Sequence, residues 1–250
     1  MTVTPSIAVI IPIFEEQESI ERVLTRLQQV LGSNGKVYLV ADNESDSTIL
    51  QVKKFMSKSP LSIDVLIQYP NSGPAKAIVF GIENSVEHFV IFMTADDSDD
   101  VEDIPKLVEL LNAGFCLVSA SRYMKHGRHI GGPVVKHALS RVAGITSKFI
   151  LRSGTSDPTN LFKGVDRSFL SSIEIESDFG FTIGLELVAK AQLHQSRGVS
   201  EIPTIWKERI TGESTFRFIR WLPSYLYWYC RLIQYRAQSI SRSAKVSRGT

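Results

Sequence analysis

Five short apolar runs, rich in Val, Ile and Phe, recur in the first half of the chain. Most of them do not alternate with polar residues, which is typical of strands buried on both faces of a parallel sheet. Helical patterns lie between them, and the first, at 19–31, has apolar residues at the 3.6-residue spacing of a single buried stripe. The predicted strands are 7–13, 36–41, 63–69, 89–94 and 115–120.

The alternation of strand and helix predicts an α/β fold with a mostly parallel sheet, flanked by helices and joined by right-handed crossovers. After Arg122 the regularity ends, and a last amphipathic helix is expected from about 216 to 240, with a break near Pro223. The other predicted helices cover 47–55, 74–86, 103–111, 134–151 and 182–192, and short extended pieces lie near 157–163 and 198–206.

A chain of 250 residues is long enough for one large α/β domain, and it contains no linker that would divide it into two. The apolar and charged fractions, 43% and 22%, are those of an ordinary globular protein. We therefore assign 1–212 to one domain, 213–240 to an amphipathic helical segment and 241–250 to a disordered tail.

Charge is distributed unevenly, although the net charge is only +2. Residues 206–250 contain nine Lys or Arg and two Glu, a local charge of +7, whereas residues 1–205 carry 19 basic and 24 acidic groups. The basic end also holds the aromatic segment FRFIRWLPSYLYWYCRLI at 216–233, whose rings and arginines suit the headgroup region of a membrane. A helix packed on the core explains the same pattern, and the sequence leaves both interpretations open.

Two cysteines, Cys116 and Cys230, provide no disulfide framework, so a reducing, cytoplasmic compartment is expected. The N-terminus has no basic region followed by an apolar stretch, which argues against a secretory signal. No run of about 18 apolar residues is present, so we expect membrane contact to be peripheral, on the cytoplasmic face.

Polar side chains follow several predicted strands, at the edge where open parallel sheets bind their ligands. The sharpest feature is the acidic loop after the fourth strand, which contains Asp96, Asp97, Asp99 and Asp100. A hard cation such as Mg²⁺ or Mn²⁺ would relieve their repulsion, but a solvated acidic turn before a helix explains the cluster equally well. A calcium-binding EF-hand loop is excluded, because Val101 occupies the position that requires Gly.

Asp42, after the second strand, either closes an Asx turn or contacts a nucleotide, and Asp46 is expected to cap the next helix. The chain has no glycine-rich phosphate loop, which argues against dinucleotide and P-loop enzymes. It has no Cys or His cluster with zinc spacing, and we interpret His126 and His129 as loop residues.

Taken together, the strand ends resemble glycosyltransferase family 2, in particular the dolichol- or polyprenol-phosphate sugar synthases, over roughly residues 7–235. The resemblance implies a nucleotide-binding GT-A fold at 1–212 and inverting transfer of a sugar from a nucleotide-diphosphate sugar. The pieces that carry it, in order, are IIPIFEEQESI, LVADNESDST, FMTADDSDDVEDIP, VSASRYM, SDPTNLFKG, GFTIGLELV and SEIPTIWKERITGES.

The resemblance also implies a nucleotide-sugar site at the ends of the first, second and fourth strands. The family's nucleotide-holding acids fall on Glu15 and Asp42, with Pro12 and Phe14 beside the first, and its metal motif reaches Asp96. These five residues are the expected contacts of the donor.

This sequence departs from the Asp-x-Asp metal motif of the family, because Thr94 occupies its first position. Asp96 is therefore expected to hold Mg²⁺ or Mn²⁺ together with Asp97 and Asp99. The first acid of the family's pair after the second strand is likewise Ala41. Both departures leave open a non-catalytic, nucleotide-sugar-binding subunit.

The family's acceptor-phosphate contacts fall on Arg122, Lys136, Ser140 and Arg209, and its active-site aspartate on Asp157. The expected acceptor is a polyprenyl or dolichyl phosphate, an anionic nucleophile that needs cations but no strong base. A glycan hydroxyl is the alternative acceptor, and Asp157 would then be the base. Thr182, which replaces a lysine common in the family, weighs slightly against the lipid phosphate.

One other enzyme class and one other partner carry less weight. A nucleotidyltransferase that makes the activated sugar would share the sheet, but it usually has a basic glycine-rich loop that IIPIFEEQES lacks. A nucleic acid would suit the basic end of the chain, but the family resemblance implies no such partner.

Overall fold

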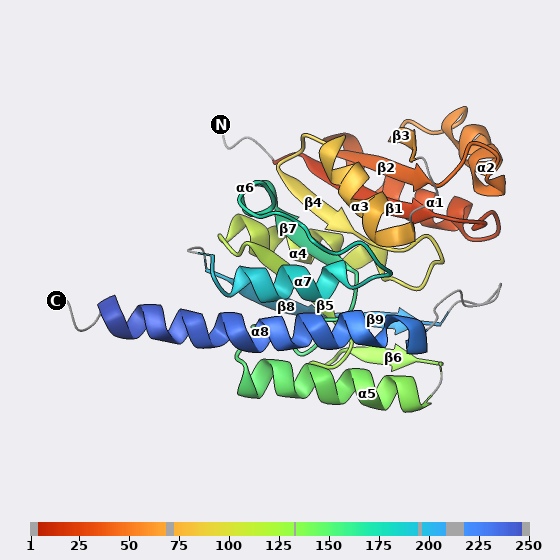
Figure 1. The fold of residues 1–250 in the computed structure, drawn as a ribbon. Helices are drawn as coiled ribbons and strands as arrows, with labels where there is room; N and C mark the ends of the chain where they lie inside the picture. The colour runs from red at the N-terminus through yellow and green to blue at the C-terminus, as the bar shows by residue number, and fades with distance from the viewer. Residues whose placement is uncertain (1–4, 69–72, 133, 195–196, 209–217, 247–250) are drawn as a thin grey trace.

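The structure is a computed structural model that describes residues 5–68, 73–132, 134–194, 197–208 and 218–246, with no side chains described at 134–136, 218–221 and 242–246. The strands are β1 Ile7–Ile13, β2 Gly35–Ala41, β3 Ser62–Ile67, β4 Phe89–Phe92, β5 Leu117–Ser121, β6 Arg128–Ile130, β7 Lys163–Asp166, β8 Val199–Pro203 and β9 Ile205–Lys207. Seven of them form one sheet in the order β3-β2-β1-β4-β7-β5-β8, and β6 pairs with β9 in a second, smaller sheet (Figure 1).

The large sheet is mostly parallel, as the sequence predicts, and β1 has the predicted bounds. The exception is β7, which runs antiparallel between β4 and β5. The extended piece expected at 157–163 becomes a strand only from Lys163, because side chains, and not a strand ladder, hold the residues before it. The parallel arrangement brings the carboxyl ends of β1, β2, β4 and β5 to the same rim.

Helices cover both faces of this sheet and bury the apolar stripes that the sequence shows. The helix α1 contributes Ile20, Val23, Leu24 and Leu27 to the core, so the predicted stripe is confirmed. One face is covered by α1 Ile20–Leu31, α2 Ser47–Met56 and α4 Ile104–Asn112, and the other by α3 Gly73–Glu83, α6 Arg167–Ser171 and α7 Ile183–Ala191.

The long helix α8, Phe218–Val246, lies against α7 and adds a further layer (Figure 1). Trp228 and Leu232 of α8 pack on Leu185 and Ala189 of α7, so one face of the aromatic segment is buried, as in the packed-helix interpretation. The expected break at Pro223 is wrong, because the helix continues through it. Pro223 lies close to the start of the helix, where a proline removes only one intrahelical hydrogen bond.

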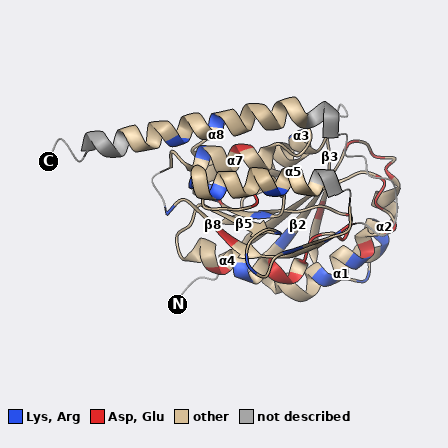
Figure 2. Ribbon diagram, turned by 90° about the horizontal axis from the view of Figure 1, so that it is seen from below, with Lys and Arg blue, Asp and Glu red and all other residues tan. Residues whose placement is uncertain are grey.

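The helix α8 also continues to Val246, into the segment predicted as a disordered tail. It contains no Asp or Glu, and Figure 2 shows the Lys and Arg residues along it. Among the residues that the structure describes, no helix has the combination of length and apolar character needed to cross a bilayer.

A buried charge network fastens α7 to the segment before it and to α8. The fully buried carboxylate of Glu186 accepts hydrogen bonds from the backbone N–H groups of Glu176 (2.7 Å) and Ser177 (2.8 Å). Lys190 lies 2.8 Å from Glu186, and its ammonium is 5.4 Å from the centre of the Trp228 ring. These contacts make α7 and α8 one packed unit.

The helix α5, Val134–Ile145, and the π-helical turn Thr146–Ile150 that follows it lie below α8 in Figure 1. Gly144 lets α5 pack directly on the backbone of the next loop, since a Cβ at this position would be 1.9 Å from the carbonyl oxygen of Ser156. The hydroxyl of Thr146 is hydrogen bonded to that of Tyr229 on α8. The helices α5 and α8 are therefore both fixed beside the rim of the sheet.

Candidate active site

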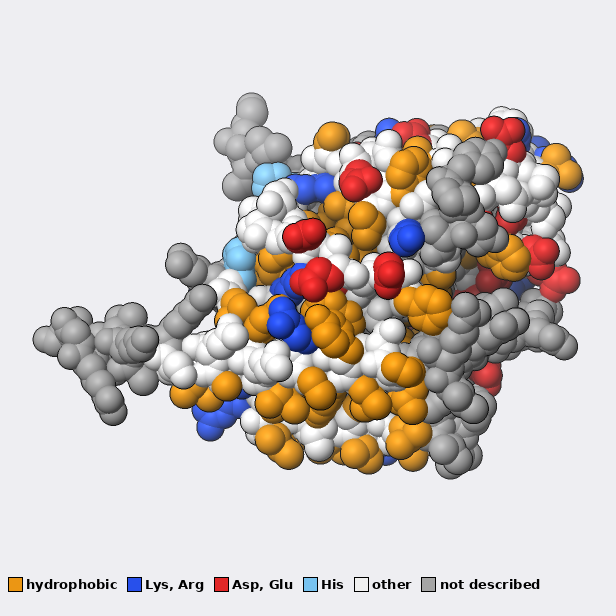
Figure 3. Space-filling model, in the orientation of Figure 1, with side chains coloured by type: hydrophobic (Ala, Val, Ile, Leu, Met, Phe, Trp, Pro, Cys, Tyr) orange, Lys and Arg blue, Asp and Glu red, His pale blue; other side chains and the backbone are white. Residues whose placement is uncertain are grey.

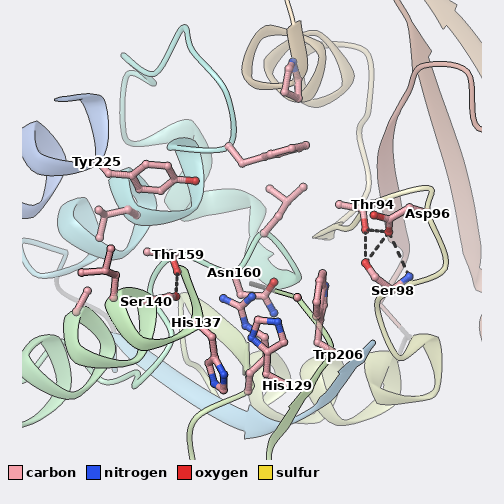
Figure 4. A pocket seen from close by; sticks show the side chains of 18 of the residues that line it. Thr94, Asp96, Ser98, His129, His137, Ser140, Thr159, Asn160, Trp206 and Tyr225 are labelled. Atoms are coloured by element: carbon pink, nitrogen blue, oxygen red, sulfur yellow. Dashed lines mark hydrogen bonds between the residues drawn. The ribbon is translucent and has the colours of Figure 1, made fainter. Parts of the chain in front are cut away.

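A cavity of about 950 Å³ extends from the rim of the sheet to α5 and α8 (Figure 4). Its walls are polar where the strands end, with Asp42 and Asp96, and apolar between the helices, with Leu226 of α8 and Val142 of α5. This cavity brings together polar and apolar residues that are far apart in the sequence, and we take it as the active-site cavity.

The ends of β1 and β2 supply part of the cavity wall. Pro12, Phe14 and Asp42 line the cavity, as expected for donor contacts. Glu15 is exposed, has a φ of +55° and donates its backbone N–H to Asp46 (3.1 Å), and the next residue, Glu16, lines the cavity instead. The family resemblance places the donor contact at Glu15, whereas the turn that follows β1 brings Glu16 to the cavity.

Among the aspartates of the acidic loop, Asp96 lies on the cavity wall. Its Oδ1 accepts hydrogen bonds from the hydroxyls of Thr94 (2.8 Å) and Ser98 (2.5 Å) and from the backbone N–H of Ser98 (3.2 Å) (Figure 4). The carboxylate is therefore held in a fixed orientation at the rim. Thr94, which replaces the first acid of the family motif, supports Asp96 as a hydrogen-bond donor.

Asp97 is part of an ion-pair network at the surface. Its two carboxylate oxygens accept from Arg22 (3.1 Å) and Arg26 (2.9 Å) of α1, and Arg26 also binds Asp100 (2.8 Å) and Glu102. Asp97 does not line the cavity that Asp96 lines. The network fixes the acidic loop to α1, which is a structural use of the extra acids.

Asp99 lies beneath the same loop, with only 3% of its surface exposed. Its carboxylate accepts from the backbone N–H of Thr94 (3.0 Å) and lies 3.0 Å from the Thr94 hydroxyl, whose single proton it shares with Asp96. Burial raises the pKa of Asp99 to about 7, although the hydrogen bonds from Thr94 oppose this shift. Asp99 therefore supports Thr94, and through it Asp96, from below the cavity.

The residues present fit a divalent cation that is bound jointly with a ligand. Within the described residues no group of three or more His, Cys, Asp or Glu side chains forms a complete metal site. Mg²⁺ is commonly held by one or two carboxylates together with the phosphates of a substrate. Asp96, a fixed carboxylate on the cavity wall, meets that requirement.

A buried ion pair between Arg122 and Asp157 lies behind the other side of the cavity. Asp157 is fully buried and accepts from Arg122 Nε (2.6 Å), from Arg122 Nη2 (2.8 Å) and from the Arg122 backbone N–H (3.0 Å). Burial alone would raise the pKa of Asp157, but the charge and hydrogen bonds of Arg122 outweigh it and hold that pKa below its usual value. Arg122 itself lines the cavity, and Asp157 does not.

The loop that carries Asp157 is held in place by several partners. Glu201 of β8 accepts from the backbone N–H (2.6 Å) and hydroxyl (2.8 Å) of Ser156, and it pairs with Lys148. The hydroxyl of Ser119 donates to the Asp157 carbonyl (3.0 Å). A base must reach the proton that it removes, and a carboxylate this buried and this well paired is suited to orienting Arg122 instead.

Lys163 lies fully buried under the same group of charges. Its ammonium donates to the carbonyl oxygen of Asn160, and burial lowers the pKa of Lys163 to about 7 against the opposing charge of Asp157. Asn160 in turn donates to the Ala120 carbonyl at the end of β5 (2.8 Å). These contacts fix Asn160 where it lines the cavity.

Four ring side chains border the cavity next to Arg122: Tyr123, His129, His137 and Trp206 (Figure 4). Tyr123 stacks on His137 with ring centres 5.5 Å apart, and His129 lies 4.5 Å from His137 and 4.6 Å from Trp206. The interpretation of His129 as a loop residue is wrong, since it belongs to β6 and lines the cavity. Sequence reasoning missed this group, because its members come from β6, α5, β9 and the loop after β5.

The acceptor contacts that the sequence predicts are only partly described. Ser140 of α5 lines the cavity and is hydrogen bonded to Thr159 (3.1 Å), as Figure 4 shows. Arg209 and the side chain of Lys136 lie outside the described residues. Arg122 and Ser140 are thus the two predicted contacts that the structure brings to one cavity.

The apolar end of the cavity opens at the surface. Five residues line this end and are at the same time exposed, by 46% or more of their surface, and together we call them the apolar mouth. They are Leu139, Val142 and Ile150 of α5 and its π-helical turn, and Leu226 and Ile233 of α8. Figure 3 shows hydrophobic side chains gathered along this part of the molecule, over α5 and α8. Phe149, 71% exposed, lies in the same turn.

Comparison with known proteins gives consistent matches. Residues 8–173 match the sequence model described as Glycosyl transferase family 2. The chain is 27% identical to a dolichol-phosphate mannosyltransferase of Pyrococcus furiosus over 96% of its own length and 67% of that protein. It is 25% identical to the polyprenol monophosphomannose synthase of Mycolicibacterium smegmatis, over 82% of this chain and 79% of that protein.

Solved structures share the fold. Glucosyl-3-phosphoglycerate synthase from Mycobacterium tuberculosis, in complex with Mn²⁺ and uridine-diphosphate-glucose, superposes with a TM-score of 0.65 and 15% identity, over 90% of this chain and 79% of that one. The same enzyme with Mg²⁺ and uridine-diphosphate gives a TM-score of 0.63. The predicted GT-A fold is confirmed.

The buried ion pair generates a stability prediction. We expect Asp157→Asn to lower the free energy of unfolding by about 3 kcal/mol or more at pH 7, because the guanidinium of Arg122 would stay buried without its counter-charge. Asp64→Asn, which removes a surface pair with Lys36, is the matched control and should cost less than about 1 kcal/mol. Urea unfolding measures both.

The pH dependence of that difference follows from the lowered pKa of Asp157. A carboxyl group with a lowered pKa stabilises the fold above its unfolded pKa of about 3.9, and this contribution is lost as the pH falls through the folded pKa. The difference between wild type and Asp157→Asn should therefore shrink at acid pH. Equal effects of the two substitutions at pH 7 would contradict the assignment.

Proposed function

Because the chain belongs to glycosyl transferase family 2, we propose that this glycosyltransferase moves a sugar from a nucleotide-diphosphate sugar to a polyprenyl or dolichyl phosphate, with inversion at the anomeric carbon. The relatives named for dolichol- and polyprenol-phosphate products support this acceptor class. The dolichol-phosphate relative matches 96% of the chain, which leaves room for only a few unmatched residues of α8.

The observation that carries the proposal is the continuity of the cavity. Its polar end, with Asp42 and Asp96, suits a nucleotide and its diphosphate, and its other end opens at the apolar mouth. A lipid phosphate has the matching form, an anionic head on an apolar tail. A free glycan would have to cover the exposed apolar residues of the mouth with hydroxyl groups, which is unfavourable.

The chemistry of the wall also favours a phosphate acceptor. Such an acceptor is already an anion, so the site must bring two anions together and does not need to remove a proton. Arg122 lines the cavity, and its fixed guanidinium offers the planar, charged donor group that phosphates prefer. In this proposal Asp157 orients Arg122, Ser140 adds a hydroxyl beside it, and Lys136 and Arg209 are further cations for the acceptor.

At the donor end, Asp96 would hold Mg²⁺ or Mn²⁺ together with the diphosphate, while Asp42 and Glu16 face the nucleotide. The metal would act as a Lewis acid that stabilises the negative charge on the leaving diphosphate. Thr94 and Ser98 keep Asp96 oriented, with Asp99 below them.

The proposal is tested by offering the protein a panel of nucleotide-diphosphate sugars with polyprenyl phosphate in detergent. We expect a lipid-linked sugar monophosphate and release of the nucleoside diphosphate. Transfer only to glycan hydroxyls would establish the alternative acceptor class. Binding of the nucleotide sugar without transfer to either acceptor would establish a non-catalytic subunit.

A second prediction concerns the metal. In Asp96→Asn we expect Mn²⁺-dependent binding of the nucleoside diphosphate to weaken at least tenfold, since an amide is a poorer ligand for a hard cation. Asp97→Asn is the matched control, and it should leave that binding nearly unchanged because Asp97 faces Arg22 and Arg26. Calorimetric titration measures both. The idea fails if a chelator leaves wild-type binding unaffected, or if the two variants behave alike.

A third prediction concerns peripheral contact with the cytoplasmic face of a membrane. The exposed apolar residues of α5 and α8 would enter the interface, while the basic residues of α8 would add salt-sensitive attraction of about 1 kcal/mol each. We expect Phe149→Glu to lower binding to anionic vesicles roughly tenfold or more, because a buried Phe is worth about 1.5–3 kcal/mol. Co-sedimentation measures this.

Val86→Glu is the control for that experiment. Val86 is 88% exposed, lies between α3 and β4 and does not line the cavity, so the same substitution there should leave vesicle binding unchanged. Equal loss in both variants would indicate a general effect of added negative charge. Wild-type protein that stays in the supernatant at low salt would refute membrane contact.

A further inference from the structure

Tyr225 reaches from α8 into the active-site cavity, and Figure 4 shows its hydroxyl pointing into that space. The other tyrosines of α8 have different surroundings. Tyr229 is hydrogen bonded to Thr146, Tyr235 accepts from Arg231, and Tyr227 is 51% exposed. The hydroxyl of Tyr225 forms no hydrogen bond with any residue that the structure describes.

The surroundings of this phenol are apolar. Leu222 and Leu226 flank it on α8, and Leu185 of α7 lines the same cavity. Burial raises the pKa of Tyr225, and the positive charge of Arg122 acts in the opposite direction. The phenol therefore remains protonated at physiological pH and has an O–H that can donate to a ligand in the cavity.

Tyr225 is half-buried, and its hydroxyl faces the cavity instead of a protein partner. Phenylalanine would fill the same apolar space without presenting a hydroxyl to the cavity. A tyrosine whose hydroxyl points into a ligand cavity is therefore best explained by a ligand atom that accepts its hydrogen bond. Arg122, Ser140 and Thr159 line the same cavity. A positive charge beside hydroxyl donors favours an anionic ligand group in this part of the cavity.

We infer that Tyr225 donates a hydrogen bond to a phosphate oxygen of the acceptor, so that α8 supplies part of the acceptor site. The inference rests on the proposed function, since it takes the lipid phosphate as the ligand. It assigns α8 a second role besides surface contact. Tyr225 would bind the phosphate head of the acceptor, while the exposed apolar side chains of α8 would contact its lipid tail.

The substitution Tyr225→Phe tests this, because it removes one oxygen and keeps the ring. Tyr227→Phe makes the same change one half-turn away, on the exposed side of α8, and is the matched control. Steady-state kinetics are measured with a short-chain, water-soluble prenyl phosphate and with a long-chain polyprenyl phosphate in detergent. Calorimetry of the nucleoside diphosphate and thermal melting are measured in parallel.

For Tyr225→Phe we expect kcat/KM for both phosphate acceptors to fall roughly tenfold or more, the value of a lost hydrogen bond to a charged group. Nucleoside-diphosphate binding and the melting temperature should stay close to wild type, and Tyr227→Phe should match wild type throughout. A defect with the long-chain acceptor alone would assign Tyr225 to the tail and overturn the inference.

Two further outcomes separate this inference from the proposed function. Wild-type transfer to prenyl phosphates with unchanged kinetics in Tyr225→Phe would overturn the role of Tyr225 and leave the proposed function standing. Wild-type protein that uses only hydroxyl acceptors would overturn the proposed function, and with it the phosphate as the partner of Tyr225. An equal loss of nucleoside-diphosphate binding would place the phenol on the donor instead.

Discussion

The buried pair of Arg122 and Asp157 is the constraint on which the cavity depends. A guanidinium at the end of β5 tolerates burial only because a carboxylate meets two of its nitrogens, and that carboxylate must come from a loop 35 residues later in the chain. Glu201 and Ser119 hold this loop, while Gly144 lets α5 pack against it. The position of α5, and with it one wall of the cavity, thus follows from satisfying a single buried charge.

The acidic loop shows what composition alone leaves undecided. Four aspartates within a few residues predict a cation, but the structure gives them different tasks: Asp96 faces the cavity, Asp97 and Asp100 pair with arginines of α1, and Asp99 supports Thr94 from below. Which carboxylate faces which way depends on the positive φ of Asp97 and on α1, and neither can be read from the spacing of the acids. The departure from the family motif at Thr94 is likewise explained by the hydrogen bonds that it donates.

Much of the fold was predictable, because buried parallel strands and amphipathic helices leave local periodic patterns, as β1 and α1 do. The rim positions were predictable for the same reason, since Asp42 and Arg122 directly follow β2 and β5 and Asp96 lies in the loop after β4. The antiparallel β7 and the ring group of His137 and Trp206 were not, because pairing partners and contacts between distant elements leave no local periodicity. The helix through Pro223 shows a local rule overridden near a helix end.

The network of Glu186, Lys190 and Trp228 bears on how separable the parts of this protein are. Leu185 packs against α8 on one side and lines the cavity on the other, so the last helix also supports the wall of the active site. A truncation before α8 would remove one wall of the active-site cavity and expose a face of α7 that carries both charged and apolar side chains. The last helix and the body of the transferase therefore form a single structural unit, and a chimaera that exchanged one without the other would lose the packing between α7 and α8.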